Sequence, residues 1–181
     1  MVKLLKYLYN YRKNQRFETL IKKIGVNKTI QLQTDIIVSN PENLTIQDYV
    51  YIGPNAHIQA LGGVTIKRGV IIGPDLRIYS ANHRFRKAES IPYDSTYIKK
   101  PVIIEENVWI GGGVTIVPGT IIGEGSIIGA GTVLSGKIDP LSIVIGNPCK
   151  VISKRNEEEY FKLKTDDKIY LKLKQQNFFR K

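Results

Sequence analysis

A strict six-residue repeat between residues 104 and 134 is the feature that most constrains the fold of this chain. Its members are aliphatic and fall six apart without a break: Ile104, Ile110, Ile116, Ile122, Ile128 and Leu134. An amphipathic α-helix would space its apolar residues by three and four, and a half-buried strand by two. A constant period of six indicates one short strand and one turn per repeat, which is typical of a parallel β-helix.

Smaller residues accompany this repeat in a fixed phase. A small or β-branched residue stands two positions before each aliphatic one: Val102, Val108, Val114, Thr120, Ser126 and Thr132. Glycine follows three of the aliphatic residues directly, at Gly111, Gly123 and Gly129. We expect three repeats to form one triangular coil, with the aliphatic side chain inside the prism and the glycine at a corner, where positive φ is tolerated. A β-sandwich with valine-rich strands is the alternative, but its strands do not recur at one interval.

The same period covers an earlier stretch and then stops. Two shorter runs, separated by a two-residue slip around Gly62, carry it: Ile46, Ile52 and Ile58, then Ile66, Ile72 and Ile78. The interval from Ile78 to Ile104 is not a multiple of six, and residues 80–100 are polar and aromatic. We therefore predict a loop of about 20 residues that leaves the solenoid, and loops of that length are usually functional.

The chain divides into three segments: a basic amphipathic helix in 1–28, the β-helix in 29–152 with the inserted loop, and a helical tail in 153–181. The apolar spacing in 3–24 predicts a helix that ends at Gly25 and either caps the first coil or lies on an anionic membrane. In the tail we expect Asn156 to cap one helix and Thr165 to start a second.

Charge is concentrated in the two tails. The net charge is +11, of which residues 1–28 carry +7 and 150–181 carry +5, while 29–149 carry −1. We interpret the tails as solvated helix faces and expect no nucleic-acid partner. Cys149 is the single cysteine, which excludes an internal disulfide and fits a reducing compartment. The N-terminus lacks the apolar core of a signal peptide, so a cytoplasmic protein is expected, with the inner face of the membrane as an alternative place.

The chain has two histidines, and their placement differs. His57 adjoins the inward-facing Ile58, so strand alternation points it outwards. His83 lies near the start of the inserted loop, at the edge of a rigid scaffold. A lone loop histidine is usually a solvated side chain, but an imidazole in this position could act as a general base.

Four short segments together resemble the hexapeptide-repeat acetyltransferases, and within them the polysaccharide and sugar O-acetyltransferases related to maltose and galactoside acetyltransferases. They are SANHRF (80–85), KKPVII (99–104), NVWIGG (107–112) and IGNPCKVI (145–152). The resemblance covers about residues 44–152. It implies a left-handed parallel β-helix, a homotrimer with active sites in the clefts between subunits, and acetyl-CoA as the acetyl donor.

The resemblance also implies roles for individual residues. His83 matches the family's catalytic histidine, which would take the proton from the acceptor hydroxyl as that oxygen attacks the thioester. The backbone N–H groups of Gly111 and Gly112 are the expected oxyanion donors. Some relatives carry serine where this chain has Gly112, so a side-chain hydroxyl is missing there. Trp109 is expected to line the cleft near the thioester, although an aromatic side chain that only fills a corner is the alternative.

The remaining candidates concern the two substrates. The CoA-binding candidates follow the family segment and its flanking cations: Gly113, Asn147, Pro148, Cys149, Lys150, Lys154 and Arg155. Cys149 stands where alanine is commoner and resembles a small apolar substitute, not a nucleophile. The acceptor-binding candidates are Asn55, Asn82, Arg84, Arg86 and Tyr97, of which most are chosen for their place in the inserted loop.

We therefore predict an acetyl-CoA-dependent O-acetyltransferase that acts on a sugar or glycan hydroxyl without a covalent intermediate or a metal. N-acetylation of a nucleotide amino-sugar and acetylation of an antibiotic use the same fold and remain alternatives. A γ-carbonic anhydrase would need three histidines on zinc, and the chain has two. A non-enzymatic basic scaffold is the last alternative, and for it the tails would matter and His83 would not.

Overall fold

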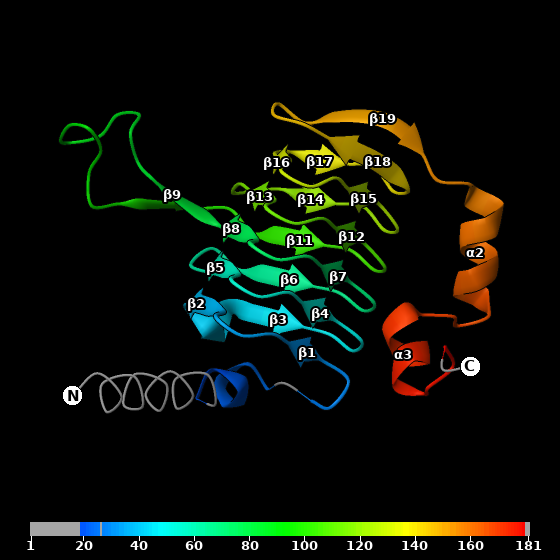
Figure 1. Cartoon of the computed structure of the whole chain (residues 1–181). Helices are drawn as coiled ribbons and strands as arrows, with labels where there is room; N and C mark the ends of the chain where they lie inside the picture. Colours follow the sequence, from blue (N-terminus) through cyan, green and yellow to red (C-terminus); the bar gives the residue numbers. More distant parts are fainter. Residues whose placement is uncertain (1–18, 26, 180–181) are drawn as a thin grey trace, which may run out of the picture.

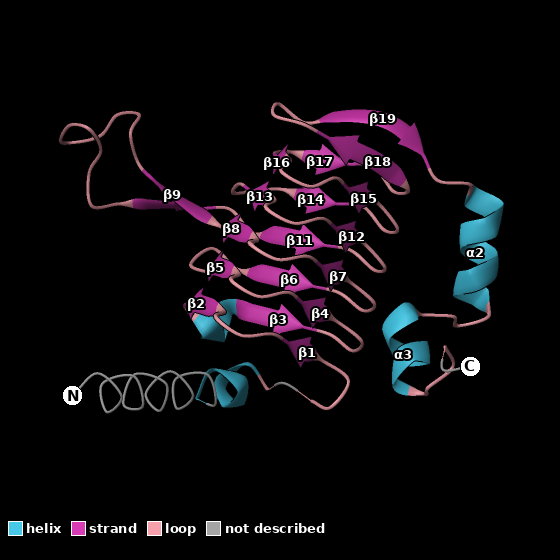
Figure 2. Ribbon diagram, viewed as in Figure 1, coloured by secondary structure: helices cyan, strands magenta, loops and turns pink. Residues whose placement is uncertain are grey.

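The computed structural model describes residues 19–25 and 27–179, which form a parallel β-solenoid of triangular section with about six turns (Figure 1). A hairpin projects from one corner, and two helices run back along the opposite side (Figure 2). Each turn contributes one short strand to each of three parallel faces. The predicted β-helix is thus confirmed, and its inserted segment and C-terminal helices are present.

The strands of each face are stacked at equivalent positions of successive turns. The first face, in spatial order, contains β1 (Gln31–Leu32), β4 (Tyr51–Ile52), β7 (Ile71–Ile72), β12 (Trp109–Ile110), β15 (Ile127–Ile128), β18 (Ser142–Ile145) and the antiparallel β19 (Lys150–Lys154). The second contains β2 (Ile37–Ser39), β5 (His57–Gln59), β8 (Arg77–Tyr79), β13 (Thr115–Ile116) and β16 (Val133–Leu134). The third contains β3 (Leu44–Ile46), β6 (Val64–Ile66), β11 (Val102–Ile104), β14 (Ile121–Ile122) and β17 (Lys137–Ile138). A short 3-10 helix, η1 (Pro41–Asn43), precedes β3.

The core is the inside of the prism, filled by the repeat residues in ladders. Ile72, Ile110 and Ile128 are register partners on the first face, and each is at most 1% exposed. The column of smaller residues is buried as well, and its hydroxyls are satisfied: Thr120 donates to the Val117 carbonyl at 2.7 Å. The periodicity therefore predicted the core correctly, because each turn must bury its apolar residues against the next.

The glycines have two structural roles, and the sequence interpretation assigned the wrong one. Gly111 and Gly123 do not have positive φ; a side chain there would meet the backbone of the next turn, with a Cβ only 2.7 Å from the Ala130 nitrogen in the case of Gly111. Positive φ occurs two residues later instead, at Gly113 and Gly125. Glycine therefore follows the repeat residue because adjacent turns approach too closely for a side chain.

The inserted segment is more ordered than the predicted loop. Its ends form the antiparallel strands β9 (Ala81–His83) and β10 (Tyr97–Lys99), which pair with each other and with no other strand of the described chain. Figure 1 shows this hairpin reaching away from the solenoid between β8 and β11. Residues 80–100 thus leave the solenoid as predicted, but on a two-stranded base.

The terminal segments agree in part with the sequence. Residues 19–24 are helical, Gly25 follows with φ of 69°, and Leu20 and Ile24 pack against the core, as expected of a cap on the first turn. The helix predicted for residues 3–18 lies outside the described residues.

The C-terminal tail forms α2 (Glu157–Thr165) and α3 (Tyr170–Gln175). The side chain of Asn156 caps α2 by accepting from the Glu159 N–H at 2.9 Å, as predicted. The prediction that a second helix starts at Thr165 was wrong, because Thr165 ends α2 and α3 begins at Tyr170. The C-terminal residues therefore form two short helices separated by a turn.

Candidate active site

His83 is held within the projecting hairpin by two aromatic rings. Its imidazole stacks on Tyr93 with centroids 3.8 Å apart and lies 4.4 Å from Tyr97, its register partner on β10. The Nδ1 atom is covered and has no hydrogen-bond partner, while Nε2 makes no hydrogen bond among the described residues. A covered, unpaired polar atom is rare in native structures and is found at catalytic sites. The ring is thus fixed with Nε2 free for a ligand.

Asp94 anchors the loop that carries these rings. Its carboxylate lies 2.6 Å from the Arg84 guanidinium and accepts the Thr96 N–H at 2.8 Å and the Glu89 N–H at 3.2 Å. The hydrogen bond from Arg84 is the main reason that the pKa of Asp94 falls to about 2. Arg84, expected to contact the acceptor, is therefore engaged with its own loop.

Replacing Asp94 by asparagine should loosen this anchor. We expect kcat for acetyl transfer to fall at least about tenfold because His83 loses its fixed position, while KM for acetyl-CoA changes little. Glu89→Gln is the matched control, since Glu89 is exposed and lies 3.7 Å from Arg84. An unchanged kcat for Asp94→Asn, or equal losses in both variants, would show that the anchor does not position His83.

The ionised form of Asp94 also stabilises the folded protein, and this stabilisation depends on pH. Its folded pKa of about 2 lies below the ordinary 3.8, so the contribution is complete above pH 3.8 and is lost as the pH falls through about 2. The acid-unfolding profile of the wild type should therefore steepen in this window relative to that of Asp94→Asn. Circular dichroism between pH 5 and 2 measures it.

The other acceptor-binding candidates of the loop are exposed. Asn82 accepts the His83 N–H through its own side chain at 2.9 Å, and Arg86 lies over the Phe85 ring at 5.6 Å. Tyr97 contributes one of the two rings that pack on His83. Tyr93 and Asp94, which complete this arrangement, were missed from the sequence because nothing in their spacing marks them.

Asn55 lies away from the hairpin, at the corner between the first and second faces. It has φ of 61° and donates from its side chain to Asp75, the equivalent residue of the next turn, at 3.3 Å. Gly113 occupies the same corner further along and donates its N–H to the Pro74 carbonyl at 2.8 Å. Asparagine, aspartate and glycine tolerate this left-handed conformation, so Asn55 and Gly113 have corner positions in the fold.

The two backbone N–H groups that were expected to bind the oxyanion differ in whether they already make a hydrogen bond. The N–H of Gly111 donates to the Ile128 carbonyl at 2.8 Å as part of the stacking between turns. The N–H of Gly112 makes no backbone hydrogen bond in the described part of the chain. The expectation for Gly111 is therefore corrected, because its donor is already committed, and Gly112 is the remaining candidate.

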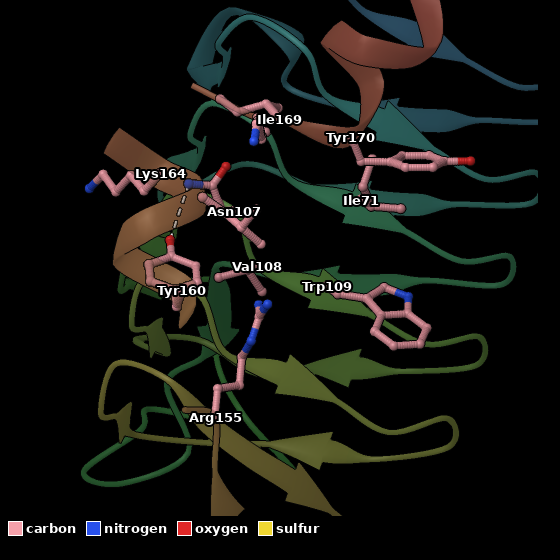
Figure 3. Close-up of a pocket in the computed structure, with 12 residues that line it drawn as sticks. Ile71, Asn107, Val108, Trp109, Arg155, Tyr160, Lys164, Ile169 and Tyr170 are labelled. Carbon is pink, nitrogen blue, oxygen red and sulfur yellow. Dashed lines mark hydrogen bonds between the residues drawn. The ribbon is translucent and has the colours of Figure 1, made fainter. Parts of the chain in front are cut away.

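Trp109 lines a pocket between the first face and the C-terminal helices. Its side chain is 56% exposed, and in Figure 3 it extends in the same direction as Tyr170, with Ile71 between them. The pocket has a volume of about 500 Å³. Its lining residues come from β7, β12, the two helices and the segments directly before them, and they include Asn107, Val108, Arg155, Tyr160, Leu163, Lys164, Lys168 and Ile169. The wall provided by α2 and α3 was not predicted from the sequence.

The helical wall is held by a partly buried hydrogen-bond network centred on Tyr160. Its hydroxyl accepts from the Asn107 side chain at 3.1 Å and donates to Glu124 at 2.8 Å (Figure 3 shows the first of these). Lys164 contacts the same Glu124 oxygen at 2.5 Å. Burial is the main cause that raises the pKa of Tyr160, so the phenol stays protonated and keeps donating.

Replacing Tyr160 by phenylalanine should lower the free energy of unfolding by about 1–2 kcal/mol, because both partly buried hydrogen bonds of its hydroxyl are lost. Tyr170→Phe is the matched control, since that hydroxyl makes no hydrogen bond among the described residues and the ring is 54% exposed. Urea unfolding followed by circular dichroism measures both. Equal midpoints for the two variants would contradict the stabilising role of the network.

The CoA-binding candidates lie at the last turn. Asn147 and Pro148 form the exposed turn between β18 and β19, and Cys149 is partly buried against the core. Lys150 and Lys154 begin and end the exposed strand β19. Arg155 donates to the Gly125 carbonyl at 3.1 Å and lies over the Tyr160 ring, so it is engaged within the chain.

His83 and Trp109 lie on different flanks of one chain. The hairpin leaves the corner between the second and third faces, whereas Trp109 lies on the first face beside α2 and α3 (Figure 1). The residues expected to act together are therefore not brought together within one copy of the chain.

No helix in 19–25 and 27–179 is long and apolar enough to cross a membrane. No three His, Cys, Asp or Glu side chains of these residues are grouped so that they could hold a metal ion.

Comparison with known proteins agrees with this architecture. Residues 101–136 match the family model described as bacterial transferase hexapeptide (six repeats). The chain is 37% identical over 150 residues to "Putative acetyltransferase YJL218W" of Saccharomyces cerevisiae, with 74% of each protein covered. It is 36% identical over 124 residues to "Putative lipopolysaccharide biosynthesis O-acetyl transferase WbbJ" of Escherichia coli, covering 65% of this chain and 60% of that protein.

Solved structures resemble it as well. A hexapeptide-repeat acetyltransferase of Vibrio cholerae complexed with acetyl coenzyme A superposes with a TM-score of 0.70 at 27% identity, covering 80% of this chain and 78% of that one. A maltose O-acetyltransferase of Clostridium difficile gives a TM-score of 0.68 at 31% identity, covering 80% and 76%. The solenoid, the family match and these relatives together show that the chain belongs to the hexapeptide-repeat acetyltransferases, with their left-handed parallel β-helix.

Proposed function

We propose that this protein transfers the acetyl group of acetyl-CoA to a hydroxyl of a sugar or glycan, with His83 as the general base. The observation that carries the proposal is the imidazole clamped between Tyr93 and Tyr97 with its Nε2 unpaired. The relatives support the class of reaction: one was solved with acetyl coenzyme A, and another is named a maltose O-acetyltransferase.

The proposed reaction is a direct transfer. Nε2 of His83 accepts the proton of the acceptor hydroxyl while that oxygen attacks the thioester carbonyl carbon of acetyl-CoA. A positioned base is needed because a neutral hydroxyl is a weak nucleophile, and it typically contributes about 10²–10⁴ in rate. The tetrahedral intermediate then expels the CoA thiolate, which takes the proton from the imidazolium. The free N–H of Gly112 is the proposed donor to the oxyanion.

The acetyl donor is proposed to lie along the last turns of the solenoid. Lys150 and Lys154 are exposed there and make no ion pair among the described residues, so they are free to meet the phosphates of CoA. Trp109 presents an exposed ring on the same face, three strands away from β19 in the sheet. This arrangement supports a donor that extends from β19 towards β12.

The active unit is proposed to be a homotrimer. One copy places His83 and Trp109 on different flanks, and the hairpin carries exposed apolar side chains such as Phe85 and Ile91, which is 95% exposed. A second copy beside the first would cover these side chains and bring the hairpin to the neighbour's first face. Closed threefold symmetry would give three equal sites.

Acetyl-CoA should raise the thermal unfolding temperature of the protein. Binding to the folded state alone stabilises by about 2.7 kcal/mol when the ligand is at a hundredfold excess over its Kd. Differential scanning fluorimetry with millimolar acetyl-CoA measures the shift. We expect the double variant Lys150→Gln/Lys154→Gln to lose most of it and the control Lys137→Gln, an exposed lysine on β17, to keep it. An unmoved wild-type unfolding temperature would show that the donor is wrong.

Acceptor identity is tested by CoA release with a panel of acceptors. We expect turnover with a sugar or oligosaccharide that offers a free hydroxyl. If the protein acetylates a nucleotide amino-sugar and none of the hydroxyl acceptors, the proposed O-acetylation is wrong. The proposal that acetyl-CoA is the donor would still stand.

A further inference from the structure

The start of the described chain and helix α3, which are far apart in the sequence, lie at the same end of the solenoid. Gln175 of α3 donates from its side chain to the carbonyl of Thr29 at 3.1 Å, a contact across 146 residues. α2 starts at the last turn and α3 ends at the first, so the C-terminal segment runs the length of the solenoid (Figure 1). The end of the solenoid that begins with β1 therefore carries lysines from both ends of the described chain, such as Lys28 and Lys174.

The cations of the C-terminal segment divide into paired and free ones. Lys172 and Arg68 both contact Asp167, and Lys168 contacts Asp166 at 3.1 Å, so these charges hold the segment in place. Lys174 is exposed and makes no ion pair among the described residues; it lies over the Tyr170 ring at 5.9 Å. Its charge therefore remains available to an outside partner.

The N-terminal side of the same end adds more free cations. Lys22, Lys23 and Lys28 are exposed and form no ion pair in the described part of the chain. The carboxylate of Asp48 adjoins this segment and accepts hydrogen bonds from Asn27 and Thr29. The three lysines are thus not tied into ion pairs among the described residues.

Exposed aromatic rings follow Lys174 at the end of the C-terminal segment. Phe178 is 64% exposed and Phe179 is 55% exposed, and they pack edge to face with centroids 5.4 Å apart. Phe179 also lies 5.7 Å from Tyr170. Exposed phenylalanine side chains in a cluster are unfavourable in water, so this group is suited to an apolar environment. We call it, together with the free lysines, the basic–aromatic end: Lys22, Lys23, Lys28, Tyr170, Lys174, Phe178 and Phe179.

We propose that the basic–aromatic end binds the surface of an anionic lipid bilayer. Lysines attracted to anionic headgroups and phenylalanines that enter the acyl boundary are the combination that holds proteins at a membrane interface. Both contributions, charge and apolar rings, point to lipid. The inference is independent of the proposed acetyl transfer, because none of the residues tested below belongs to the proposed site.

The test is flotation of the full-length protein with vesicles in a density gradient. Phosphatidylcholine vesicles serve as the neutral probe and vesicles of phosphatidylcholine with phosphatidylglycerol as the anionic one. We expect binding to the anionic vesicles that weakens as salt is raised, and at least about tenfold weaker binding to neutral ones.

Two variants and a matched control separate the contributions. Lys22→Gln/Lys23→Gln/Lys28→Gln should weaken binding to anionic vesicles at least about tenfold, and Phe178→Ser/Phe179→Ser should weaken it at every salt concentration. The control Lys87→Gln/Lys99→Gln/Lys137→Gln removes the same charge from exposed lysines elsewhere and should bind as the wild type does. Circular dichroism confirms that each variant is folded.

Three results would overturn the proposal. They are absence of wild-type binding to anionic vesicles, equal binding by the two variants and the wild type, and equal weakening in the control, which would mean that net charge alone drives binding. Binding of a fluorescent single-stranded oligonucleotide without vesicle binding would identify nucleic acid as the partner instead. Acetyl transfer to a soluble acceptor, measured alongside, reports separately on the proposed function.

Discussion

Replacing His83 by alanine is expected to lower the rate of acetyl transfer at least about a hundredfold, which is the ordinary cost of losing a general base. The fold should not change, because the imidazole is only partly buried and makes no side-chain hydrogen bond in the described part of the chain. The measurement is CoA release under saturating acetyl-CoA, with light scattering to verify the assembly.

His57 provides the matched control for this experiment. It is the other histidine of the chain, it is exposed on the second face, and it pairs through the backbone with Ile37 and Arg77. His57→Ala should retain wild-type turnover. Near-normal turnover by a folded His83→Ala protein would remove the base from the proposed mechanism.

Mixing two inactive variants should restore activity. Trp109→Ala is expected to be inactive without loss of stability, since the ring is 56% exposed. If His83 of one copy acts beside Trp109 of the next, co-expressed His83→Ala and Trp109→Ala chains form some sites with both residues intact. In a closed trimer that contains both kinds of chain, only one of the three interfaces pairs an intact His83 with an intact Trp109, so about one third of the sites are complete. We expect activity near that fraction of the wild type.

The arrangement of the copies decides the outcome of the mixing experiment. Differently tagged chains purified through both tags contain the mixed trimers, and CoA release is measured on them. A site built within one chain would remain inactive in every mixture. A stable, fully active monomer of 20.5 kDa would likewise end the proposal.

The wall made by α2 and α3 gives this chain a feature that the repeat does not specify. Tyr170 stands beside Trp109 across Ile71, so the tail adjoins the face proposed for acetyl-CoA (Figure 3). The network of Tyr160 keeps that wall in place. Changes at Tyr160 are therefore expected to affect stability first.

The solenoid and its core could be predicted from the amino-acid pattern alone. A period of six can be recognised within a short stretch of sequence. Each repeat residue faces the inside of the prism because its own strand and turn are six residues long. Ile110, Ile116 and Ile122 are all fully buried as a result. The break in the six-residue period predicted the position of the inserted segment, and the capping side chain of Asn156 predicted where α2 begins. These features follow from residues that are near one another in the chain.

The other features could not be predicted, because they depend on contacts between residues that are distant in the sequence. The roles of the glycines depend on how closely the next turn approaches, as at Gly111 beside Ala130. The clamp of His83 depends on Tyr93 and Asp94, which the loop brings back to it without any periodic signal. The path of the C-terminal tail is fixed by Asp167 pairing with Arg68 across 99 residues, a contact that spacing within the sequence does not encode.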